Sequence, residues 1–166
     1  PTPDHLAGIE AATGSLGHGL PIGLGMALSA RIQKQSYKVV ALLSDGECNE
    51  GSVWEAAMMA AAQKVDNLMV VIDFNKWQST GRSEEILALA PLVDKWRAFG
   101  WDACEINGHD MGQLVEVLTK EKNSEGKPVA VIAHTVKGKG VSFMEDDNNW
   151  HYRIPSEEEL VSAHKE

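Results

Sequence analysis

Short apolar runs alternate with stretches of helical spacing along most of the chain. Four runs predict strands, and they cover residues 38–43, 68–73, 101–106 and 128–134. The first two are apolar blocks typical of strands buried within a sheet. Helices are expected at 16–32, 52–64 and 91–99, after a capping residue at Asp110, and from about residue 156.

Strands that alternate with helices predict parallel βαβ units joined by right-handed crossovers. The expected fold class is therefore α/β, a three-layer sandwich around a mainly parallel sheet. Residues 1–166 are expected to form a single domain. The first residues are rich in glycine and contain no strand, so we expect this domain to lack its N-terminal portion. Two stretches, 75–85 and 137–155, are expected to be irregular, and long loops in a compact domain are usually functional or disordered.

Composition narrows the function classes. Hydrophobic residues make up 43% and charged residues 23%, and the net charge is −9 with scattered basic residues, so no nucleic-acid partner is expected. No run approaches the roughly 18 apolar residues of a membrane helix, so no membrane partner is expected. Cys48 and Cys104 form neither a metal-type spacing nor a disulfide framework, which favours the cytoplasm.

Polar residues follow the first two expected strands. Asp45 comes directly after the first strand, and Asn75 follows the second. Ligands of an open parallel sheet bind at the carboxyl ends of its strands, so both side chains could reach one ion there. Carboxylate, amide and carbonyl oxygens suit Mg²⁺ or Ca²⁺. Alternatively, Asp45 is only a helix cap beside the turn residue Gly46.

A glycine-rich run, 14–19, opens the first expected helix. Glycines allow the backbone to approach a ligand closely, and the amides at a helix N-terminus favour an anion. The alternative is a tight turn that only introduces a helix of small residues. The run lacks the dinucleotide-binding spacing and has no strand before it.

Taken together, these motifs resemble those of the thiamine-diphosphate enzymes, and of the transketolase family in particular. The resemblance covers nearly the whole chain, at 13–19, at 44–46 followed by Asn75, at 47–51, at 135–140 and at 150–151. It implies the thiamine-diphosphate-binding fold and a pyrophosphate-type domain. Three positions depart from the family pattern: Ser44 replaces its first glycine, Phe74 a common polar residue and His18 a common glutamine.

The resemblance implies two cofactors, thiamine diphosphate and Mg²⁺ (or Ca²⁺). Asp45, the Asn75 side chain and the Trp77 carbonyl would coordinate the metal, which would bridge to the diphosphate. The amides of Gly46 and Glu47 would lie near the diphosphate.

Further roles follow from the same resemblance. Gly14, Ser15 and Leu16 would lie along the middle of the cofactor and its aminopyrimidine. Lys137 and His151 are the candidate catalytic residues, since they would face the diphosphate or the substrate channel.

The implied activity is transfer of a two-carbon ketol unit from a ketose phosphate to an aldose. The family's activating glutamate belongs to a C-terminal domain for which this chain has no match. We therefore expect a partner domain or subunit, in a homodimer or heterotetramer, with sugar phosphates as substrates. Two alternatives are the α-type subunit of a 2-oxo-acid dehydrogenase or decarboxylase complex and a non-catalytic cofactor-binding subunit. The loop 137–140 with His151 favours transketolase over the first, and the Asp45–Asn75 pair argues against the second.

Overall fold

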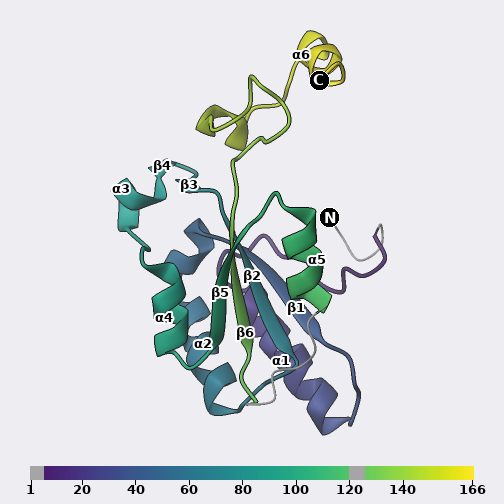
Figure 1. The fold of residues 1–166 in the computed structure, drawn as a ribbon, viewed down its shortest axis with the longest axis vertical. Helices are drawn as coiled ribbons and strands as arrows, with labels where there is room; N and C mark the ends of the chain where they lie inside the picture. Colours follow the sequence, from purple (N-terminus) through teal and green to yellow (C-terminus); the bar gives the residue numbers. More distant parts are fainter. Residues whose placement is uncertain (1–5, 120–125) are drawn as a thin grey trace.

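The computed structural model describes residues 6–119 and 126–166 (Figure 1). Its main sheet is parallel, with the strand order β1-β2-β6-β5, and it confirms the four expected strands. Their bounds are β1 Val39–Ser44, β2 Leu68–Phe74, β5 Asp102–Asn107 and β6 Val129–His134. In β1 and β2, Ser44 lies opposite Asp73, so the residues that follow these two strands meet at one edge.

The helices follow the expected order, with ends shifted by a few residues. They are α1 Gly19–Ile32, α2 Gly51–Ala62, α4 Leu92–Ala98, α5 Met111–Thr119 and α6 Glu157–Ala163. Asp110 accepts hydrogen bonds from the backbone N–H groups of Gly112 and Gln113, as expected of a cap. Ser156 caps α6 in a reciprocal capping box with Glu159.

Two apolar clusters form the layers of the sandwich. The larger lies between the sheet and α1, α2 and α4, and the smaller lies on the opposite face, where Val117 of α5 packs against β2 and β6. Small residues let α1 approach the sheet closely: a side chain at Gly23 would lie 3.5 Å from Ala41. The α/β three-layer fold predicted from the sequence is therefore confirmed.

Two details differ from expectation. Val40 and Leu42 of β1 are 53% and 72% exposed, so this edge strand is not covered on both faces. The stretch 75–85 is not irregular: it contains a small antiparallel hairpin and a short helix. These elements are β3 Trp77–Gln78, β4 Gly81–Arg82 and α3 Ser83–Leu87.

The carboxyl ends of the strands all point toward the same end of the molecule (Figure 1). The 3₁₀ turn η1, Gly46–Asn49, follows β1 there, and the β3–β4 hairpin follows β2. Beyond β6, residues 136–166, here called the C-terminal segment, extend away from that end and include η2, Asn148–His151, and α6. Across the described residues, no helix has the length and apolar character needed to cross a bilayer.

Candidate functional site

Asp45 is the buried acid at the carboxyl edge of the sheet. Its side chain is 0% exposed. Oδ1 accepts a hydrogen bond from the Gly46 N–H at 2.9 Å, and Oδ2 accepts one from the Ser83 hydroxyl at 2.8 Å. Burial raises the pKa of Asp45, although hydrogen bonds from Ser83, Gly46 and the backbone of Lys76 act in the opposite direction. A cation at this carboxylate would relieve the penalty of burying its charge.

Asn75 lies in the turn that meets Asp45. Its Oδ1 accepts a hydrogen bond from the Trp77 N–H at 3.0 Å, and its Nδ2 donates to Asp73 at 3.2 Å. The backbone of Lys76, between them, has a φ of 69° and hydrogen-bonds to Asp45. The turn that holds Asn75 and Trp77 therefore packs against Asp45, as the parallel arrangement of β1 and β2 predicts.

The oxygen atoms available as ligands at this edge suit a hard cation. In the part of the chain that the structure describes, no three His, Cys, Asp or Glu side chains group to hold a metal. The protein's share of a metal shell would be the Asp45 carboxylate, the Asn75 amide oxygen and the Trp77 carbonyl. Mg²⁺ commonly completes such a shell with phosphate oxygens and water.

A neighbouring group suits an anion. The amide nitrogen of Gln78 is buried and has no hydrogen-bond partner among residues 6–119 and 126–166. Its side chain lies against Gly46, where an added Cβ would be 3.2 Å from Gln78 Cγ. A buried donor without a partner is unfavourable unless a ligand or water accepts from it. The Asp45 carboxylate, which suits a cation, and the Gln78 side-chain amide, which suits an anion, therefore lie side by side. This arrangement fits a metal-bound diphosphate.

The glycine-rich run is tied to this edge at Gly17. The Gly17 N–H donates to Glu47 Oε1 at 3.0 Å, and the Gly17 carbonyl accepts from the Ser52 hydroxyl at 2.8 Å. Gly17 has a φ of 82°, and an added Cβ would lie 2.6 Å from both Glu50 and Ser52 atoms. The residues before it, Gly14, Ser15 and Leu16, are exposed beside this anchored glycine.

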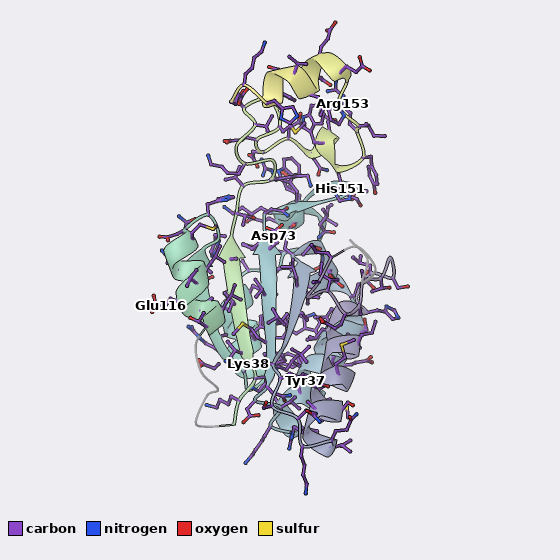
Figure 2. All side chains as sticks on the ribbon, turned by 90° about the vertical axis from the view of Figure 1, so that its right-hand side faces the viewer. Tyr37, Lys38, Asp73, Glu116, His151 and Arg153 are labelled. Atoms are coloured by element: carbon purple, nitrogen blue, oxygen red, sulfur yellow. The ribbon has the colours of Figure 1, made fainter. Side chains whose placement is uncertain are left out.

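Lys137 and His151 lie together in the C-terminal segment. The Lys137 Nζ is 3.4 Å from His151 Nδ1. Figure 2 shows His151 at the end of that segment nearest the sheet, where Asp73 marks the carboxyl end of β2. In the described residues, neither Lys137 nor His151 hydrogen-bonds to Asp45 or Asn75.

Sequence reasoning missed two hydroxyl groups that support the site. Ser83 holds the Asp45 carboxylate, and Ser52 holds the Gly17 carbonyl. Neither lies in a recognisable motif, and each acts on a residue more than thirty positions away, so no local pattern marks it. The side chain of Glu47 was also missed as an anchor, since the family resemblance points only to its backbone amide.

A parallel sheet with Asp45, Asn75 and a glycine-rich run at its carboxyl edge defines an α/β domain of the thiamine-diphosphate-binding class. The family described as "Transketolase, thiamine diphosphate binding domain" matches residues 1–166. The chain belongs to this family.

Relatives and solved structures agree with this assignment. The chain is 45% identical over 159 residues to one subunit of the apulose-4-phosphate transketolase of Phocaeicola vulgatus, covering 96% of this chain and 57% of that protein. It is 43% identical over 138 residues to the 6-deoxy-6-sulfo-D-fructose transketolase subunit SqwG of a Clostridium species, covering 83% and 50%. The structure of the Campylobacter jejuni transketolase matches with a TM-score of 0.88 at 29% identity, over 95% of this chain and 26% of that chain. The chain thus spans about half the length of these subunits.

Proposed function

We propose that this chain is the thiamine-diphosphate- and divalent-metal-binding part of a transketolase-like enzyme. That enzyme transfers a two-carbon ketol unit from a ketose phosphate to an aldose. The observation that carries the proposal is the buried Asp45 carboxylate, which packs against the Asn75–Trp77 turn with no cationic partner among the residues described. Family membership supplies the identity of the cofactor.

Each residue at the edge has a role in this proposal. Asp45, Asn75 and the Trp77 carbonyl hold Mg²⁺ or Ca²⁺. The backbone amides of Gly46 and Glu47, with the buried Gln78 amide, donate to the diphosphate.

The remaining residues hold the cofactor's middle and act on the substrate. Gly14, Ser15 and Leu16 line the middle of the cofactor, kept in place by the anchored Gly17. When bound, thiamine diphosphate supplies the carbon nucleophile that breaks and forms bonds beside a carbonyl. Lys137 and His151 face the diphosphate or the substrate, where they hold charge and handle protons.

The relatives' names support a two-subunit enzyme. Two of them are each named as one lettered subunit of an apulose-4-phosphate transketolase, which implies a second subunit. We propose that the partner of this chain carries the activating glutamate. A partner that is a separate subunit would give a heterotetramer, and one that is fused to this chain as a domain would give a homodimer. One relative is named for a sugar phosphate and another for a sulfo-sugar, so we propose a ketose with an anionic terminal group as the donor.

Calorimetric titration with thiamine diphosphate and Mg²⁺ tests the cofactor site. Asn75→Ala should abolish saturable, metal-dependent binding. The matched control is Asn107→Ala, because Asn107 forms the same side-chain turn with the N–H of His109, at 3.0 Å, at the end of a different strand of the sheet. The parent and Asn107→Ala should bind alike. Equal binding by Asn75→Ala, or no binding by the parent with and without its partner subunit, would refute the proposed site.

A further inference from the structure

An ion pair joins the C-terminal segment to the β3–β4 hairpin. The Arg82 guanidinium of β4 donates two hydrogen bonds to Asp146, at 2.7 Å to Oδ1 and 2.6 Å to Oδ2. The indole N–H of Trp77, in β3, donates to the same carboxylate at 2.9 Å. One acid of the C-terminal segment is therefore held by both strands of the hairpin.

Further contacts reinforce this ion pair. The Arg82 guanidinium stacks on the Trp77 ring, 3.7 Å from its centre. The Asn148 side chain donates to the carbonyls of Gln78 and Ser79, at 2.9 and 3.2 Å. An exposed ion pair usually adds little stability, but bidentate geometry, a stacked aromatic ring and several joint contacts are the conditions under which it contributes more.

The β3–β4 hairpin also borders the proposed metal site. Trp77 is the residue whose carbonyl is assigned to the metal, and Arg82 immediately precedes Ser83, which donates to Asp45 at 2.8 Å. Arg82 therefore lies, along the chain, between two residues that shape the metal site.

On its other side, the ion pair holds the residues assigned to the substrate. The Asp146 N–H donates to the Lys137 carbonyl at 2.8 Å, and Lys137 contacts His151. Asp146 has a φ of 56°, and its loop is compact, since an added Cβ at Gly138 would lie 2.4 Å from the Met144 carbonyl oxygen. A displacement of Asp146 therefore moves Lys137 as well.

We propose that Arg82 and Asp146 are positioning residues that couple cofactor binding at the hairpin to the placement of Lys137 and His151. This inference rests on the proposed cofactor site. Because coupling between two sites is reciprocal, a docked C-terminal segment strengthens cofactor binding, and bound cofactor holds the segment in place. Trp77 links the two, since its carbonyl is assigned to the metal and its indole N–H donates to Asp146.

Hydrogen–deuterium exchange of the full chain without cofactor is the first test. Arg82→Ala and Asp146→Asn should each speed exchange of amides in residues 137–151 by about fivefold or more, since each removes interactions that hold the C-terminal segment on the hairpin. Asparagine is chosen at position 146 because it tolerates a positive φ. Arg82→Lys, which keeps the charge but loses the fork, should fall between the parent and Arg82→Ala. Unchanged exchange in both variants would overturn the proposal.

The chain offers a matched control in Arg153. It also stacks on a tryptophan, Trp150, and pairs with an acid, Glu159, but all three residues belong to the C-terminal segment. Figure 2 shows Arg153 farther from the sheet than His151. Arg153→Ala should loosen α6 without speeding exchange in residues 137–147. If it speeds exchange there as Arg82→Ala does, the effect is general and the proposal is wrong.

The second test repeats the exchange measurement with thiamine diphosphate and Mg²⁺ added to the chain and its partner subunit. In the parent the cofactor should slow exchange in 137–151, and in Arg82→Ala this protection should be lost, with affinity about five- to tenfold weaker. Asn75→Ala separates the two hypotheses. If it binds like the parent, the proposed cofactor site is wrong. If it loses binding while Arg82→Ala keeps parental affinity and protection, the site stands and the coupling is overturned.

Discussion

The Glu47 carboxylate holds the backbone of Gly17, accepting its N–H at 3.0 Å. Glu47 belongs to the turn after β1, and Gly17 lies in the glycine-rich run that leads into α1, so one hydrogen bond joins two parts of the proposed cofactor site. Ser52 completes the attachment from the start of α2. The position of the glycine-rich run therefore depends on the same turn that follows Asp45.

Gly17→Ala should disrupt this attachment. Alanine is strained at a φ of 82°, and its Cβ would lie 2.6 Å from Glu50 and Ser52 atoms. We expect a loss of about 1–3 kcal/mol in urea unfolding, with weaker thiamine diphosphate binding. The control is Gly25→Ala, inside α1 with open space around it, which should stabilise the chain by about 0.5–1 kcal/mol. Equal effects of the two substitutions would contradict the strain at Gly17.

Asp45→Asn should stabilise the metal-free chain at neutral pH. Burial raises the pKa of Asp45 above its ordinary 3.8, so the unfolded chain loses this proton first. As the pH rises past that value, ionisation lowers the stability of the folded state relative to the unfolded one. Asparagine removes this penalty, so its Tm advantage should be present at pH 7 and vanish below about pH 4. Mg²⁺ with thiamine diphosphate should raise the Tm of the parent but not that of Asp45→Asn. A lower metal-free Tm for Asp45→Asn than for the parent at pH 7 would contradict this account.

Trp96 and Trp101 should respond differently to replacement by phenylalanine. Trp96 is 0% exposed, its ring centre is 4.9 Å from that of Trp101, and its N–H has no partner within the described part of the chain. The Trp101 N–H instead donates to the Ala57 carbonyl at 2.9 Å. Trp96→Phe removes an unpaired donor, whereas Trp101→Phe breaks a buried hydrogen bond, so the second should be worse by about 1 kcal/mol. Chemical denaturation measures the difference, and Trp96→Ala should lose about 3–5 kcal/mol.

The Asp146 carboxyl should titrate at an unusually low pH. The Arg82 guanidinium, and then the Trp77 indole, lower the pKa of Asp146 to about 2. A depressed pKa contributes stability that is present above the ordinary value of 3.8 and is lost as the pH falls through about 2. Carbon-13 NMR of the carboxyl should show this midpoint in the parent and a higher one, approaching 3.8, in Arg82→Ala. A parental midpoint near that ordinary value would show that the ion pair does not persist in solution.

Much of the fold was predictable because the signals are local. The apolar runs at 38–43 and 68–73 are long enough to identify strands, and both were found within one or two residues of their observed ends. Asp110 and Ser156 were correctly predicted as helix starts, because a cap acts on backbone groups two or three residues away. The β3–β4 hairpin was missed because two-residue strands are too short to show a hydrophobic period.

The candidate site was predictable where it follows from chain order in a parallel sheet. Asp45 and Asn75 each follow a strand, and neighbouring parallel strands bring their carboxyl ends together. Their metal ligation, and the roles of Lys137 and His151, stay predictions.

By itself, the sequence determined the α/β class, the order of the helices and strands along the chain and the polar residues at the strand ends, since each depends on short-range periodicity and turn chemistry. Only the tertiary structure decided which distant side chains meet. Glu47 reaches Gly17 across 30 positions, and Arg82 reaches Asp146 across 64. The tertiary structure also left Leu42 exposed, because the burial of a strand face depends on what packs against it. The sequence pattern of an apolar strand is the same whether or not that neighbour is present.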